Sequence, residues 1–148
     1  MPSKAAHLEL AKRNGEMLVH LVERIDQFPE WAATVAFYRA LHLVEAAFAV
    51  DKEIGHGGDH GTRNWHLKKK KKYAKVYAGY RPLWAASIIA RYLENDEQAG
   101  SYICFSEYLS AHDVNRKLVR HYLRVVESSV EQLLGEPLSP IALPPLSA

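Results

Sequence analysis

The sequence has almost no cysteine and no long apolar run. Its single cysteine, Cys104, excludes an intramolecular disulfide framework and any zinc site built from several cysteines. No segment approaches the roughly eighteen uncharged apolar residues of a membrane span, so no membrane partner is predicted. The N-terminus enters a charged amphipathic pattern without the apolar core of a secretory signal. The length of 148 residues predicts one domain, and we expect a cytoplasmic helical protein.

Acidic residues are absent from His60 to Tyr92, and this stretch holds nine of the nineteen basic residues. Six aromatic residues interleave it: Trp65, Tyr73, Tyr77, Tyr80, Trp84 and Tyr92. A basic surface attracts phosphate groups and exposed rings stack on unpaired bases, which predicts RNA or nucleotide binding. A solvated lysine face on a helix whose aromatic residues fill the core explains the same pattern equally well.

Apolar residues recur at helical spacing, and no segment alternates with the period of two typical of a strand. We expect helices over about residues 4–27, 30–52, 63–79, 82–93 and 113–134. Phe28 ends the first helix because Pro29 follows it, and Pro82 starts the fourth, since proline suits a first helical turn. The polar stretch 95–100 ends the fourth helix, and residues 101–112 form a loop with one turn.

Glycine and proline mark the segments between and after these helices. Residues 54–62 hold four glycines and form a loop. Asp113 is expected to cap the last helix and Gly135 to end it. Four prolines then predict an extended or disordered tail. The predicted fold is all-α, an up-and-down bundle of four to five helices over residues 1–135, with a flexible proline-rich tail over 136–148.

The second helix is apolar nearly all round, which predicts a position deep inside the bundle. Its polar exceptions, Arg39, His42 and Glu45, follow each other at steps of three and therefore share one narrow arc. The structural interpretation is that His42 and Glu45 bond each other or a neighbouring helix, because buried polar groups are normally satisfied. The functional alternative is an arc that faces a groove, a dimer seam, or a nucleotide pocket shared with Tyr92.

The loop HGGDHGTRNWH contributes His56, Asp59, His60, Arg63 and His66. As an RNA site it would combine imidazoles that exchange protons near neutral pH with an arginine that forks onto phosphate. As a metal site it would offer imidazoles and a carboxylate, but its spacing matches no zinc pattern. We therefore predict neither a metal nor a cofactor. The plain alternative is a flexible loop with a helix cap.

Arg116 and His121, on the last helix, are the predicted catalytic pair. An imidazole can take the proton of a ribose 2′-hydroxyl, and a guanidinium can stabilise the pentacoordinate phosphate. Five α-helical steps rotate by about 140°, so we expect the two side chains on different faces unless they converge across a dimer seam. The structural alternative is a solvated basic face with Arg120 and Arg124.

Together these patterns predict a set of RNA or nucleotide contacts: Arg39, His42, His60, Arg63, Lys68, Lys69, Lys72, Lys75, Arg91 and Tyr92.

The segment WAATVAFYRALHLVEAAFA (31–49) resembles the aromatic- and alanine-rich helix with an embedded histidine and glutamate of HEPN (higher eukaryotes and prokaryotes nucleotide-binding) domains. In that family a glycine-containing loop follows, here with His60 and Arg63. YAGYRPLWAASIIARYL (77–93) is similar to the family's tyrosine-leucine-serine-arginine-tyrosine helix. The resemblance covers about residues 8–134 and implies an up-and-down helical bundle, usually dimeric.

Many HEPN domains are metal-independent ribonucleases of toxin–antitoxin and phage-defence systems, and others only bind nucleotides or RNA, often beside a nucleotidyltransferase. The nucleases carry an arginine, usually followed by a polar residue, and a histidine after four to six further residues. Arg116 and His121 match this spacing, but Lys117 replaces the polar neutral residue. Arg63 has a suitable neighbour, yet His66 follows too soon. The resemblance therefore leaves ribonuclease activity open.

Two functions are consistent with these patterns. The first is an RNA- or nucleotide-binding HEPN-like protein, with metal-independent ribonuclease activity as an open addition. Its expected partners are RNA, a second copy of the chain, and an antitoxin or a nucleotidyltransferase. The alternative is a non-catalytic dimeric interaction module that docks an acidic protein partner.

Overall fold

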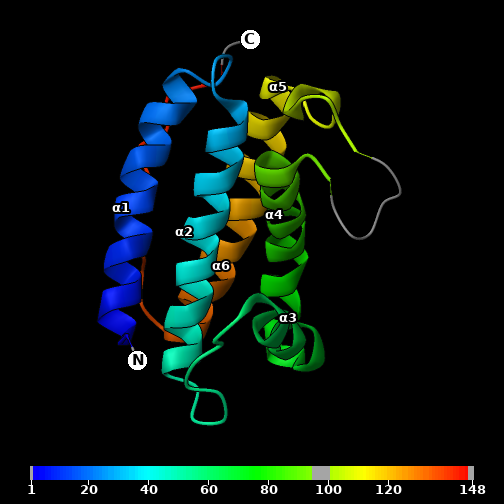
Figure 1. Cartoon of the computed structure of the whole chain (residues 1–148). Helices are drawn as coiled ribbons and strands as arrows, with labels where there is room; N and C mark the ends of the chain where they lie inside the picture. Colours follow the sequence, from blue (N-terminus) through cyan, green and yellow to red (C-terminus); the bar gives the residue numbers. More distant parts are fainter. Residues whose placement is uncertain (1, 95–100, 147–148) are drawn as a thin grey trace.

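The computed structural model describes residues 2–94 and 101–146 and consists of antiparallel helices (Figure 1). The long helical segments are α1 (Lys4–Glu23), α2 (Pro29–Ala49), α4 (Ala74–Tyr92) and a continuous last helix made of η3 (Val114–Tyr122) and α6 (Leu123–Leu134). The short ones are α3 (His60–Lys69), η1 (Lys71–Tyr73), η2 (Phe105–Glu107) and α5 (Ala111–Asp113). No strand occurs in the described part of the chain, so the all-α prediction is confirmed.

Helix α2 lies at the centre of the bundle, as its sequence predicts. It packs against α1, α4, η3 and α6, and Phe37, Val44 and Phe48 are among its buried residues. Pro29 occupies the first turn, where its missing N–H costs no helical hydrogen bond. None of the described helices is long and apolar enough to cross a bilayer.

Several predicted helix ends are wrong. Helices α1 and α2 end three to four residues earlier than expected, at Glu23 and Ala49. The break expected between Gly79 and Pro82 is absent, because α4 runs through both residues and the chain breaks instead at Lys70. A Cβ on Gly79 would lie 2.6 Å from the Tyr122 carbonyl oxygen, so this glycine permits close helix packing. The break predicted at 95–100 lies outside the described residues.

The last helix starts with a π-helical segment, which the sequence does not predict. In η3 the backbone bonds span five residues instead of four, and the N–H that follows this segment, that of Leu123, still bonds to the carbonyl of Leu118. The cap is Ser110, whose hydroxyl accepts from the N–H of Asp113 at 3.1 Å, and Asp113 itself is helical. Gly135 ends the helix in the left-handed conformation, as predicted.

The proline-rich segment 136–146 is extended, and it is packed against the bundle. Figure 1 shows it returning along α1. Leu138, Ile141 and Leu143 contact the hydrophobic core, and the Ser139 carbonyl accepts from Arg39 at 3.3 Å. Residues 136–146 therefore lie against the bundle.

Candidate nucleic-acid interface

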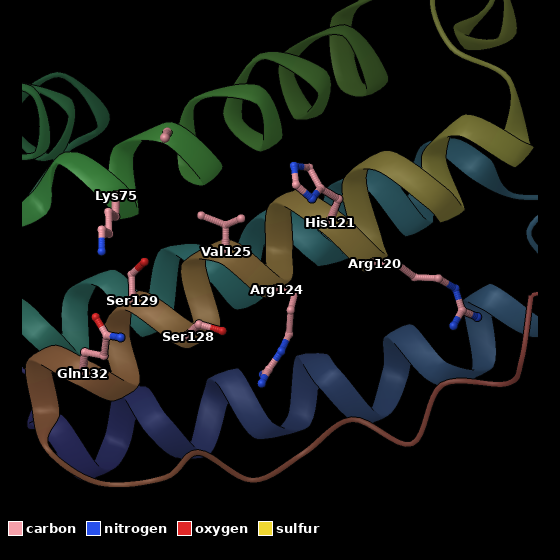
Figure 2. Close-up of a pocket in the computed structure, with 9 residues that line it drawn as sticks. Lys75, Arg120, His121, Arg124, Val125, Ser128, Ser129 and Gln132 are labelled. Carbon is pink, nitrogen blue, oxygen red and sulfur yellow. The ribbon is translucent and has the colours of Figure 1, made fainter.

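A groove of about 390 Å³ lies between α4 and the last helix (Figure 2). Its lining residues are Lys75, Ala78, Arg120, His121, Arg124, Val125, Ser128, Ser129 and Gln132. None of these nine residues is acidic. Figure 2 shows His121 directed towards α4 and Lys75 directed towards Ser129, whereas Arg124 points to the side of α1. The groove therefore combines positive charge with hydroxyl and amide groups, a lining suited to phosphate.

The lysine segment (residues 68–75) runs from the end of α3 through η1 into α4. Lys70 pairs with Glu53 at 2.5 Å and Lys72 with Asp51 at 2.7 Å. Its other lysines are exposed, and no described carboxylate pairs with them: Lys68, Lys69, Lys71 and Lys75. Because Lys75 also lines the groove, the lysine segment leads directly into it.

Asp51 anchors the lysine segment to the end of α2. Its carboxylate accepts from the Tyr73 hydroxyl at 2.6 Å and lies 2.7 Å from Nζ of Lys72. Burial by itself raises the pKa of Asp51, but the bonds from Lys72 and Tyr73 outweigh burial and hold this pKa well below its usual range. The segment is thus fixed by a charged group that stays ionised at neutral pH.

The π-helical register of η3 bears on Arg116 and His121, the predicted catalytic residues, because the α-helical rotation that separated them does not apply to this segment. In a π-helix the backbone hydrogen bonds join residues five apart, so side chains at this spacing are closer in rotation than in an α-helix. The neighbouring pair shows this register directly, since Nε of Arg120 donates to Oδ1 of Asn115 at 2.8 Å. His121 is exposed and lines the groove. Arg116 is also exposed, with Nη2 lying 3.6 Å from Asp113.

Two predicted RNA contacts are buried in ion pairs. Arg39 is 2% exposed, and its Nε and Nη2 both donate to Oε2 of Glu127, at 2.9 and 2.7 Å. Arg63 is 5% exposed and donates to Oε1 of Glu45 at 2.8 Å. RNA could reach either guanidinium only by displacing its carboxylate. For Glu45 the structural interpretation is confirmed.

The predicted contacts His42 and His60 are held by other side chains of the bundle. Nδ1 of His42 lies 3.1 Å from Nδ1 of His7 on α1, and Nδ1 of His60 lies 3.2 Å from Nη1 of Arg63. Burial, followed by nearby Arg63 and Arg91, lowers the pKa of His60. Burial also lowers the pKa values of His42 and His7. These rings are therefore neutral at pH 7 and supply no charge for phosphate.

Arg91 and Tyr92 lie at the opposite end of α4 from Lys75, roughly 25 Å away at a rise of about 1.5 Å per residue. Cζ of Arg91 lies 5.4 Å from the centre of the Tyr92 ring, and Nη1 of Arg91 donates to the Tyr38 hydroxyl at 3.1 Å. The predicted contacts therefore do not form one continuous surface. Of the ring residues, Tyr92 and Trp65 are exposed, at 64% and 55%, whereas Tyr73 and Tyr80 are buried.

Sequence reasoning missed several groove residues that a local pattern contains. Val125, Ser128 and Gln132 follow the predicted His121 at steps of three and four, and this spacing places them on one helix face. His7 was missed for another reason. Its partner His42 lies 35 residues further along the chain, and no local pattern carries that contact.

No protein-family model, curated protein or solved structure matches this chain.

Proposed function

We propose that the protein binds RNA or nucleotides through the lysine segment and the groove into which it leads. The observation that carries the proposal is the lining of the groove, which contains no acidic residue and in which neither Lys75 nor His121 is paired with a described carboxylate. Four exposed lysines of the segment also have no described carboxylate partner, so the positive charge is available to a polyanion. Trp65, exposed on α3, offers a ring on which a base stacks.

We further propose that the chain is a HEPN-like domain that acts as a homodimer in a toxin–antitoxin or phage-defence system, with an antitoxin or a nucleotidyltransferase as its partner. The antiparallel bundle around the aromatic- and alanine-rich α2 agrees with the resemblance of that helix. Ribonuclease activity is a second candidate, favoured by one observation. Because η3 is π-helical, side chains five residues apart are closer in rotation than in an α-helix, which favours a common approach of Arg116 and His121 to one phosphodiester.

Salt dependence of RNA binding tests the proposal. A labelled single-stranded RNA is titrated with the wild-type chain at several salt concentrations in EDTA. Replacing Lys68, Lys69 and Lys71 together with glutamine should lower the slope of log K against log salt by about 2, since each phosphate contact on a single strand contributes about 0.7. The matched control replaces three exposed basic residues of α1 and its cap: Lys12, Arg13 and Arg24. This control should keep the slope.

The same incubations show whether the RNA is cut. Cleavage in EDTA that disappears in His121→Ala supports the ribonuclease, and intact RNA removes it while leaving the binding proposal standing. A salt-independent affinity, or equal slopes for the two triple variants, contradicts RNA binding by the lysine segment. Copurification of an acidic protein that survives nuclease treatment would instead favour the interaction module.

A further inference from the structure

A second polar cluster lies at the end of the bundle where α1 begins and α2 ends, outside the groove (Figure 1). Its centre is the carboxylate of Glu45, whose side chain is 2% exposed. Oε1 accepts from Nε of Arg63 at 2.8 Å, and Oε2 accepts from the N–H of Gly57 at 3.0 Å. Nδ1 of His56 lies 3.2 Å from the same Oε2. The cluster thus joins α2, α3 and the glycine-rich loop.

The glycines of this loop bring His56 to Glu45. Gly55 and Gly58 adopt positive φ angles of 73° and 84°, which glycine accepts without strain. A Cβ on Gly57 would collide with the Glu45 carboxylate, so only glycine lets the backbone N–H come this close. The loop is therefore shaped to hold one imidazole and one N–H against a buried carboxylate.

His7 completes the cluster from α1 and has an unused nitrogen. The residue is 4% exposed. Its Nδ1 is bonded to His42 at 3.1 Å, while its Nε2 is buried and has no hydrogen-bond partner. A buried ring nitrogen without a partner is costly and calls for an explanation. A histidine whose Nδ1 is fixed by a neighbour and whose Nε2 is vacant has the arrangement of a metal ligand.

We propose that His7, Glu45 and His56 bind a divalent transition-metal ion of the zinc class. One ligand-capable atom from each residue lies within 4.8 Å of the others. Zinc–ligand bonds of about 2.0–2.2 Å place tetrahedral ligands about 3.3 Å apart, so the side chains close by roughly an ångström on binding. Two imidazoles with one carboxylate are a known ligand set for zinc, and they leave a fourth position for water.

The chemistry of the cluster favours zinc over magnesium or calcium. Imidazole nitrogen suits zinc, copper and nickel, whereas magnesium and calcium require oxygen ligands. His56 is the most exposed of the three ligands, with its side chain at 30%, and the ion therefore enters from the loop. This proposal departs from the sequence prediction, which weighed the loop without His7 and Glu45.

Metal titration of the full, untagged chain after EDTA treatment tests the site. We expect one equivalent of Zn²⁺ to bind, Co²⁺ to give the visible absorption of tetrahedral coordination, and Mg²⁺ not to compete. His7→Ala and His56→Ala should each weaken Zn²⁺ binding by more than about 100-fold. His42→Ala, which removes only the partner of His7, should weaken it by about 10–100-fold. His20→Ala, an exposed histidine on α1, is the matched control and should bind as the wild type does.

Thermal unfolding in EDTA checks that each variant folds, and Zn²⁺ should raise the Tm of the wild type through ligand linkage. If His7→Ala does not fold, Zn²⁺ binding is compared between the wild type and His56→Ala, because His56 lies on the loop and is partly exposed. Wild-type protein that binds no stoichiometric Zn²⁺, or equal Zn²⁺ binding by wild type and His56→Ala, overturns the proposal. RNA binding is measured in EDTA, where the proposed metal site is empty. The RNA-binding proposal and the zinc proposal can therefore fail independently of each other.

Discussion

At the scale of single residues, two buried charges on α2 fix the neighbouring elements. Arg39 bonds to Glu127 on α6 and, through Nη1, to the Ala11 carbonyl on α1 at 2.7 Å. Glu45 bonds to Arg63 on α3. A buried charge costs several kcal/mol unless a partner and further hydrogen bonds compensate it. Helices α1, α3 and α6 must therefore pack around α2 in the positions that bring these partners to Arg39 and Glu45.

Replacing Arg39 should test this role. Arg39→Ala leaves the Glu127 carboxylate, whose side chain is 9% exposed, without its main partner, and we expect a loss of about 3–5 kcal/mol in unfolding free energy. Arg124→Ala removes the other cation that contacts Glu127, at 3.8 Å and with a side chain 61% exposed, and should cost less than about 1 kcal/mol. Urea denaturation measures both values. Similar losses of unfolding free energy in the two variants would contradict a larger stabilising role for the buried Arg39–Glu127 pair.

The sequence indicates that the buried polar groups of α2 need hydrogen-bond partners, but it does not identify those partners. An arc of Arg39, His42 and Glu45 on an apolar helix indicates that these groups must be satisfied inside the bundle. Which groups satisfy them depends on contacts distant in sequence, such as His7 with His42. Arg63 is an example. The sequence predicts that its guanidinium binds phosphate, but in the structure it donates to the buried carboxylate of Glu45.

At the scale of elements, α4 and the last helix approach each other at Gly79. The groove lies along this contact, and the π-helical segment η3 forms part of it. The Tyr122 carbonyl and the side chains of Val125 and Val126 surround the glycine so closely that no methyl group fits. A larger residue would push the two helices apart and reshape the groove.

Gly79→Ala should therefore destabilise the protein by about 1–3 kcal/mol through overpacking, although alanine favours helix by about 1 kcal/mol. Gly61→Ala in α3 is the matched control. Its Cβ meets nothing closer than 3.5 Å, so this change should be neutral or stabilising by up to about 1 kcal/mol. Thermal or urea unfolding compares the two. A Gly79→Ala variant as stable as the wild type would contradict the packing described here.

Helix identity was predictable from the sequence, and several boundaries were not. Periodic apolar residues are a strong local signal, so the long helices and the central place of α2 were predicted. Pro82 and Gly79 are local breaking signals that packing between α4 and the last helix overrides. The π register of η3 also has no local signal, and it removes the α-helical argument that separated Arg116 from His121.

At the scale of the whole molecule, the basic and glycine-rich segments gather at one end, whereas the groove continues along the bundle to Arg120 and His121 in η3. The lysine segment, the glycine-rich loop and α3 all lie where α1 begins and α2 ends (Figure 1). Half-buried Arg91 and exposed Tyr92 lie at the other end of α4 and are separate from them. A polyanion bound at the lysine segment would therefore lie near the His7–Glu45–His56 cluster and away from Tyr92.

The segment 136–146 extends the core of the bundle along α1. Ile141 contacts the core, and its Cγ1 lies 3.3 Å from the position of a Cβ on Gly15. Ile141→Ala should lower the unfolding free energy by about 1–2 kcal/mol, less than the 2–5 kcal/mol of a fully buried site, because Ile141 is half-buried. Ala142→Ser, at an exposed neighbour, should change it little, and urea denaturation compares them. Equal stability of the two variants would mean that this segment is not part of the folded core.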